Sequence, residues 1–227
     1  CRQHTFQILT KRAKRMREYC SDPRTIRRVY EEVCDVTMTL DCKVLLIAPG
    51  TTPSFAPETV ARNELVYLDR WPLPNVWLGV SAEDQKRADE RVPELLATPA
   101  AVRFVSAEPL LGEIDFTKIR FVANGDKWVC NSLDFSDALV GGKPGFGPLD
   151  WIIVGGASGP NARPMNIAWA LAIRDQCRDA GVRCFVKQLG ARPFGHDDAP
   201  MGLRHKKRAD MSEWPADLRI REIPDAR

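Results

Sequence analysis

The chain has 227 residues, and its 44% hydrophobic content is enough to bury a core of ordinary size in a single domain. Thirty-three basic and thirty acidic side chains leave a formal charge of +3, which does not by itself require a nucleic-acid partner. No apolar run of about 18 residues and no signal-peptide pattern occurs, so we expect a cytoplasmic protein without a membrane partner. The seven cysteines include no CxxC pair and no Cys/His ligand spacing, and no metal site within the chain is predicted.

The first predicted strand covers residues 6–9 and is followed by Thr10-Lys11-Arg12. A strongly basic helical pattern then extends over 11–32, and Ser21-Asp22-Pro23 interrupts it at a point where proline can begin a second helix. An apolar run at 43–48 predicts another strand, and residues 58–70 predict a helix. The abrupt start at Cys1 leads us to expect the C-terminal part of a longer protein.

Two further strands are predicted at 76–80 and 102–105, and they end in matching residues, Ser81-Ala82-Glu83 and Ser106-Ala107-Glu108. A helix is expected between them, because Asp84 has capping spacing and apolar residues recur at helical intervals as far as Leu96. Strands that alternate with helices in this way indicate an α/β fold.

Residues 117–150 differ in kind from the rest of the chain. Asn124-Gly125-Asp126 lies between two apolar stretches and predicts a β-hairpin, so we interpret about 117–150 as an insertion into a single α/β domain that spans 1–227. Residues from about 191 to 227 are expected to form a polar tail, in which Trp214-Pro215 is the predicted anchor.

The stretch from 151 to 190 is the most informative part of the sequence. An apolar strand at 151–154 meets the glycine-rich segment 155–159, and a helix over 167–180 follows, with Asn166 as its N-cap and Gly181 after its last turn. A second apolar strand at 184–186 then leads into Lys187. Glycines at a strand end allow the close approach of a ligand to the backbone.

Function in such folds gathers at the carboxyl ends of the strands. We predict catalytic roles for Glu108, Lys187 and Glu83. The predicted cofactor-binding residues are Thr10, Lys11, Ser81, Ser106, Gly155, Gly156 and Ser158.

Each of these assignments has a structural alternative. Glu83 and Glu108 could act as acid and base, but Glu83 could equally stabilise the start of its helix and Glu108 could pair with an arginine. Lys187 could serve a pocket or form a salt bridge to one of the glutamates. The basic runs at 11–17 and 204–208 could contact nucleic-acid phosphates or remain solvated.

Several segments together resemble a known family. They are Gln7–Arg12, Trp77–Ser81, Arg103–Gly112, Trp151–Gly156 with Arg163-Pro164, Phe185–Gln188 and Glu213–Glu222. These segments are similar to the phage and prophage family named after mycobacteriophage gene products thirty-seven and sixty-eight, whose function is uncharacterised. The resemblance does not extend to 43–70 or 117–150.

The resemblance implies a partial (β/α) barrel of TIM or radical-SAM type with a β-hairpin insertion. Members of that family carry an additional N-terminal three-cysteine motif similar to the one that binds a [4Fe–4S] cluster in radical S-adenosylmethionine enzymes. Residues 1–227 have no such motif, so the resemblance predicts a chain that is inactive without an iron–sulfur region. The family also commonly has Glu in the glycine segment, where this chain has Ala157.

Three functions therefore follow as expectations. The first is the C-terminal part of a phage-derived, radical-SAM-like barrel with no cofactor held by this chain alone, although S-adenosylmethionine and a [4Fe–4S] cluster are expected in the full-length protein. The second is a non-catalytic module that contacts nucleic acid through 11–17 and 204–208. The third is a cluster-free α/β enzyme that uses Glu83 and Glu108 on a small molecule.

Overall fold

The computed structural model describes residues 4–29, 71–134, 148–195, 199–202 and 210–225. The predicted strand at 43–48, the predicted helix at 58–70 and the basic run at 204–208 lie outside these residues. No helix in the described ranges is long and apolar enough to cross a membrane.

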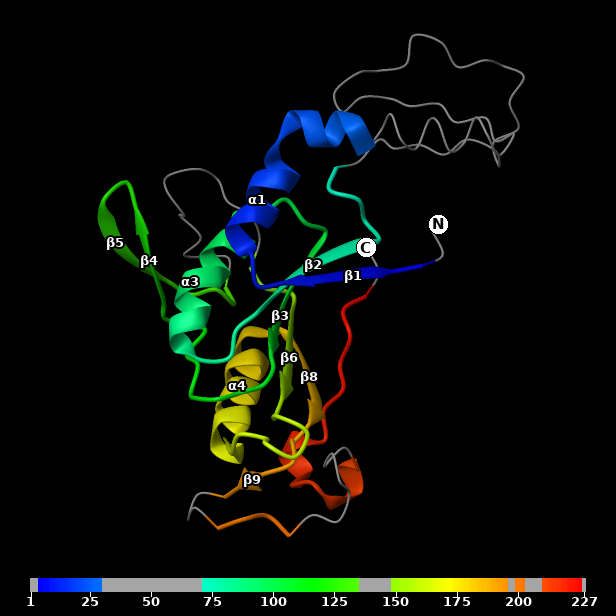
Figure 1. The fold of residues 1–227 in the computed structure, drawn as a ribbon, viewed down its shortest axis with the longest axis vertical. Coiled ribbons are helices and arrows are strands. Elements are labelled where there is room, and N and C mark those ends of the chain that lie inside the picture. Colours follow the sequence, from blue (N-terminus) through cyan, green and yellow to red (C-terminus); the bar gives the residue numbers. More distant parts are fainter. Residues whose placement is uncertain (1–3, 30–70, 135–147, 196–198, 203–209, 226–227) are drawn as a thin grey trace, which may run out of the picture.

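Five strands form one parallel sheet, and they lie side by side in the order in which they occur in the chain (Figure 1). They are β1 (Phe6–Thr10), β2 (Val76–Ser81), β3 (Val102–Ala107), β6 (Trp151–Gly155) and β8 (Arg183–Gln188). Each matches a strand predicted from an apolar run, and the α/β class is confirmed.

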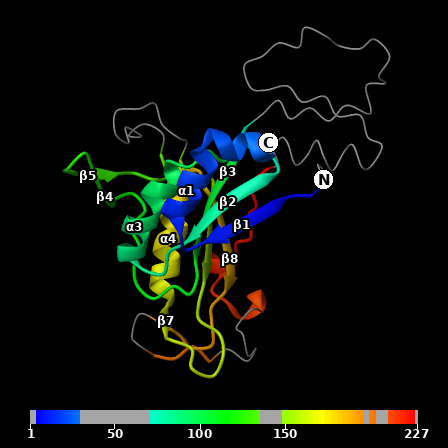
Figure 2. The same ribbon diagram turned by 45° about the horizontal axis from the view of Figure 1, so that its top comes forward.

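The helices α1 (Ala13–Ser21), α3 (Gln85–Leu96) and α4 (Ile167–Ala180) cover one face of this sheet (Figures 1 and 2). Residues 23–29, which follow α1, are also helical, as the break at Pro23 predicted. The main hydrophobic core lies between the helices and the strand residues that point toward them, such as Val80, Val105 and Val154. Parallel strands joined by helices are expected to bury this face fully.

Both ends of α4 were predicted correctly. The Asn166 side chain accepts a hydrogen bond of 2.9 Å from the backbone N–H of Ala168, and Gly181 adopts a left-handed conformation with φ 69° directly after the last turn. An amide oxygen at the first position satisfies a backbone donor that the helix itself leaves open.

We expect Asn166→Ala to lower the free energy of unfolding by about 1 kcal/mol, the usual cost of removing a capping side chain. Urea titration of the variant measures this loss. Asn161→Ala is the matched control, because Asn161 is an exposed loop residue outside any helix. Equal stability of the two variants would show that the cap contributes nothing.

The opposite face of the sheet, here called the inner face, carries an aromatic layer. The ring centroids of Trp77 and Trp151 lie 5.9 Å apart at an interplanar angle of 85°, and Phe104 and Phe185 lie 5.8 and 6.0 Å from Trp151. Edge-to-face and tilted pairs at these separations are favourable aromatic contacts. Trp77, Phe104 and Trp151 are buried, so this face is packed as well.

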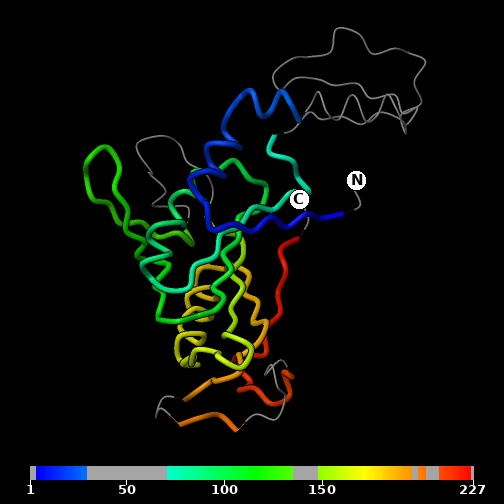
Figure 3. Tube along the Cα trace, in the orientation of Figure 1, coloured from blue at the N-terminus to red at the C-terminus, as the bar shows by residue number. Residues whose placement is uncertain are grey.

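The C-terminal tail closes one edge of the sheet. Phe185 and Arg221 form an antiparallel bridge, the N–H of Val186 donates to the carbonyl of Ile220 at 2.9 Å, and the Trp151 indole N–H donates to the carbonyl of Glu222 at 2.9 Å. Figure 3 shows the tail running beside β8. Trp214 is buried, which confirms the predicted anchor.

The predicted hairpin is present and consists of β4 (Ile119–Ala123) and β5 (Asp126–Cys130). Asn124 and Gly125 form its turn with φ values of 55° and 89°, the left-handed conformation that a two-residue hairpin turn requires. A second two-stranded sheet pairs β7 (Met165–Asn166) with β9 (Pro193–Phe194).

β1 departs from the expectation that an apolar run is covered on both faces. Phe6, Ile8 and Leu9 are 46%, 49% and 48% exposed. Within the described residues β1 pairs only with β2, so it is an edge strand. Apolar character alone predicted the strand correctly but did not predict its neighbours.

Candidate functional site

Polar side chains replace the aromatic layer at the carboxyl end of the inner face. Ser81 lies four residues after Trp77 in β2, Ser106 two residues after Phe104 in β3, and Lys187 two residues after Phe185 in β8. Because side chains alternate along a strand with a period of two, each polar residue points to the same face as the aromatic residue before it.

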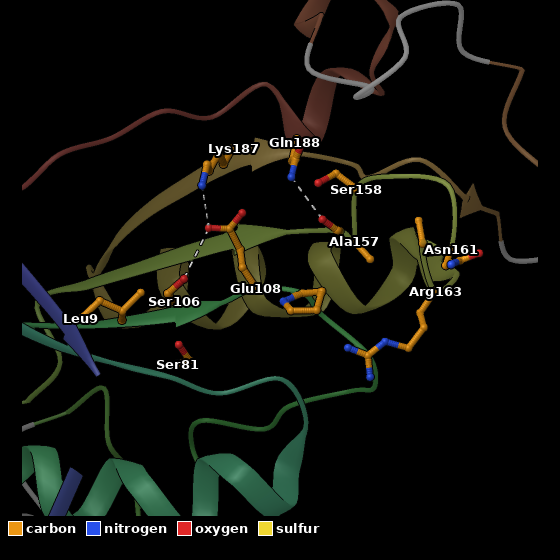
Figure 4. A pocket seen from close by; sticks show the side chains of 13 residues that line it. Leu9, Ser81, Ser106, Glu108, Ala157, Ser158, Asn161, Arg163, Lys187 and Gln188 are labelled. Atoms are coloured by element: carbon orange, nitrogen blue, oxygen red, sulfur yellow. Dashed lines mark hydrogen bonds and ion pairs between the residues drawn. The ribbon is translucent and has the colours of Figure 1, made fainter. Parts of the chain in front are cut away.

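These residues surround a cavity of about 480 Å³, here called the rim cavity, which is within the usual range for small-molecule sites. Six of the predicted site residues line it together. They are Gly156 and five residues that Figure 4 labels, Ser81, Ser106, Glu108, Ser158 and Lys187.

Glu108 lies at the centre of the rim cavity. Its Oε2 atom accepts a hydrogen bond from Ser106 Oγ at 3.4 Å and forms an ion pair with Lys187 Nζ at 3.3 Å (Figure 4). The Glu108 side chain is 16% exposed, whereas that of Lys187 is 59% exposed. The carboxylate is therefore largely enclosed by the protein, whereas the Lys187 side chain is mostly open to solvent.

Two consecutive glycines make room for this arrangement. A Cβ atom on Gly155 would collide with the Glu108 carboxylate, and one on Gly156 would collide with the backbone of Leu189. Only glycine allows the strand end to approach both groups so closely. The close approach predicted for the glycine segment is thus used by the protein's own Glu108 and by the chain after β8.

Backbone hydrogen bonds hold the strand ends around the cavity together. The N–H of Leu110 donates to the carbonyl of Gly155, and the N–H of Leu111 donates to the carbonyl of Glu83, both at 2.8 Å. The Gln188 side-chain amide donates to the carbonyl of Gly156 at 3.2 Å. The segments that follow β2, β3, β6 and β8 therefore position one another, which fixes the polar groups of the site.

Glu83 does not line the rim cavity. It is buried, and it forms ion pairs with Lys11 and, at 3.0 Å, with Arg91 of α3. Burial alone would raise the pKa of Glu83, but the hydrogen bond from Lys11 and the charges of Arg91 and Lys11 bring that pKa below its usual value. The alternative role at the start of the helix belongs to Asp84, whose side chain caps α3 by accepting a hydrogen bond from the backbone N–H of Arg87. Glu83 is a carboxylate paired with Lys11 and Arg91, and it lies apart from Glu108.

Three other predicted residues lie beside the cavity without lining it. Thr10 accepts a hydrogen bond of 3.0 Å from the backbone N–H of Arg12, Lys11 is occupied by Glu83, and Gly155 packs beneath Glu108. The site also contains Asn161 and Arg163, which the sequence assignment missed. The sequence feature that could have indicated these two residues is the length of the glycine-rich connection after β6, which continues to residue 164 before β7 begins.

The described residues do not fit an iron–sulfur cluster. Among them, no group of three His, Cys, Asp or Glu side chains could hold a metal ion. Cys177 and Cys184 are buried on the helix side of the sheet, and Cys20 and Cys130 belong to α1 and β5. Hydrogen bonding to Cys184 and burial hold the pKa of Cys177 far above its usual value, as expected for a structural thiol.

Comparison with known proteins and protein families identifies the family of this chain. No curated protein and no solved structure matches the chain. A family model does match, over residues 1–214, and it therefore includes every strand of the parallel sheet and the whole rim cavity. The chain belongs to this family, which is described as a protein of unknown function, DUF5131.

Proposed function

We propose that the rim cavity binds a small cationic ligand through Glu108, and that the chain is the ligand-binding part of a radical-SAM-like (β/α) barrel of phage or prophage origin. The observation that carries the binding proposal is the Glu108 carboxylate, which is mostly buried and already pairs with an ammonium group, that of Lys187. A ligand ammonium can take the place of this exposed lysine without leaving Glu108 unpaired.

The barrel part of the proposal is supported by the sheet. Five parallel strands in sequential order, with helices on one face and a packed inner face, have the arrangement expected for consecutive segments of a (β/α) barrel. Polar residues at the carboxyl ends of several strands are typical of the active face of such barrels. The resemblance set out in the sequence analysis supplies the radical-SAM character.

S-adenosylmethionine is the ligand that we propose for this cavity. Its ammonium group would pair with Glu108, its carboxylate with Arg163, and its ribose hydroxyls with Ser81 and Ser106. The molecule would supply a sulfonium centre whose bonds can be cleaved. The residues of this chain bind and orient it, and because they do not fit the cluster, we assign them no redox step.

Isothermal titration of the protein with S-adenosylmethionine tests this proposal. Glu108→Gln is expected to weaken binding roughly 10- to 100-fold, the loss of one or two charge-assisted hydrogen bonds. Glu113→Gln is the matched control, because Glu113 is exposed and lies outside the cavity. Undiminished binding by Glu108→Gln would overturn the role of Glu108, and the absence of binding by the unmodified protein would overturn the choice of ligand.

Gly155→Ala provides a second variant that keeps the carboxylate. The atoms nearest to the added methyl group belong to the Glu108 side chain, which is flexible, so we expect the fold to adjust while the carboxylate moves away from Ser106 and Lys187. The thermal midpoint is expected to stay close to that of the unmodified protein while affinity falls. A variant that unfolds, or one that binds normally, would contradict this account of Gly155.

A further inference from the structure

Basic residues are concentrated in the segment 11–29, which follows β1. Residues 11–29 contain eight basic and two acidic side chains, a net of six positive charges, whereas the whole chain has a net charge of +3. The remaining residues are therefore acidic on balance. Charge separated in this way produces a local positive potential even when the protein as a whole is nearly neutral.

The five basic residues between 11 and 17 fall into two groups. Lys11 pairs with Glu83, and Arg17 pairs with Glu94 at 2.6 Å, so both serve the fold. Arg12, Lys14 and Arg15 are exposed and form no ion pair with any described residue. Neutralising these three side chains removes no ion pair with the described residues, which leaves their charges available to a partner.

An exposed aromatic ring, that of Tyr19, lies on the same side of α1 as Arg15. The Tyr19 side chain is 59% exposed, and it lies one helical turn after Arg15, so the two side chains are neighbours on the helix surface. Cations beside an exposed aromatic ring can bind the phosphates of a single-stranded nucleic acid while one of its bases stacks on the ring.

The packing of α1 argues against a membrane surface as the partner. Ala13 is buried, and Met16 and Cys20 pack against the main core, so the apolar side of the helix is already used. Tyr19 is the only large exposed apolar side chain in this helix, which the structure describes throughout. An interfacial helix needs a continuous apolar face to enter the lipid boundary, and α1 does not offer one.

We propose that Arg12, Lys14, Arg15 and Tyr19 form a binding surface for single-stranded nucleic acid. The surface begins at Arg12, two residues after the last residue of β1, and it continues along α1. Figures 1 and 2 show α1 following β1. It uses none of the residues assigned to ligand binding in the rim cavity, so it does not depend on the function proposed there. Three cations imply about three phosphate contacts of a sequence-independent kind.

Fluorescence anisotropy with a labelled oligothymidylate tests the surface. Three phosphate contacts predict that log Kobs falls against log salt concentration with a slope of roughly −2. The triple variant Arg12→Gln, Lys14→Gln, Arg15→Gln is expected to bind at least about tenfold more weakly and to lose most of this slope. Tyr19→Ala is expected to weaken binding while it leaves the slope unchanged, because stacking releases no counterions.

A charge-matched control lies on the hairpin. The triple variant Lys118→Gln, Arg120→Gln, Lys127→Gln removes three exposed basic side chains from another part of the molecule, and it is expected to bind like the unmodified protein. Two of them pair with exposed or half-buried carboxylates, Lys118 with Asp115 at 3.2 Å and Arg120 with Asp89 at 3.8 Å, so the thermal midpoint of this variant is measured as well. Equal losses from both triple variants, tighter binding to duplex than to single-stranded DNA, or binding only to phosphatidylserine vesicles would each overturn the proposal. Glu108→Gln should bind the oligonucleotide like the unmodified protein, so the experiments can contradict the nucleic-acid surface without contradicting the ligand site, and the reverse.

Discussion

Trp214→Ala is expected to lower the free energy of unfolding by about 3–5 kcal/mol, as large-to-small changes of buried aromatic residues do. Trp214 is only 2% exposed and packs into the main core together with Leu218. Its ring also lies 5.8 Å from the guanidinium carbon of Arg221, which stacks on Phe185 as well. Loss of the indole would therefore leave a cavity and loosen the segment that covers the edge of β8.

Equilibrium denaturation followed by far-ultraviolet circular dichroism measures this effect without relying on tryptophan fluorescence. Trp128→Ala is the matched control, because Trp128 is 45% exposed on β5, and its change is expected to stay within about 1 kcal/mol. A loss below about 1 kcal/mol for Trp214→Ala would mean that the tail is a loosely attached appendage.

Glu83→Gln is expected to lower the free energy of unfolding by about 3 kcal/mol at neutral pH, because it removes one partner from a buried pair. The Glu83 and Arg91 side chains are only 10% and 12% exposed, so Arg91 would keep its charge in a poorly solvated place. Lys11 is 61% exposed and can return to water, so we assign its loss no cost.

The same variant predicts a pH dependence. Because the pKa of Glu83 is lower in the folded protein than the value of about 4.3 in the unfolded chain, its stabilisation is complete above that value and is lost as pH falls through the folded pKa. The stability difference between the unmodified protein and Glu83→Gln should therefore shrink below about pH 4.

Urea titrations at several pH values measure this difference. Glu90→Gln serves as the control, because Glu90 is exposed on α3 and has no ion pair with the described residues. A difference that does not change with pH would show that Glu83 acts through packing and not through its charge.

Local patterns were sufficient to predict much of the fold. The apolar runs, the caps at Asn166 and Gly181 and the Asn124-Gly125 turn each depend on residues near in sequence, and the structure has the corresponding strands, helix and hairpin. The exposure of β1 could not be predicted in this way. Burial of a strand depends on what lies beside it, and an apolar run contains no information about that.

The sequence predicted the roles of the two site glutamates less well than it predicted the strands. Glu83 and Glu108 end the identical motif Ser-Ala-Glu after adjacent strands, and their serines are partners in the strand register. Glu83 meets Lys11 and Arg91, whereas Glu108 lies over Gly155 and meets Lys187. These partners come from distant parts of the chain, so only the tertiary structure separates the paired carboxylate from the one that faces the cavity.

The sequential strand order also bears on how the protein is made. Each strand of the sheet lies beside the one synthesised before it, so β2, β3, β6 and β8 can join in turn as the chain leaves the ribosome. The edge of β8 stays open until residues 220–222 arrive, because these supply its last backbone partners. A nascent chain that stalls before Trp214 would expose this strand edge, so residues 220–222 protect β8 from pairing with another chain.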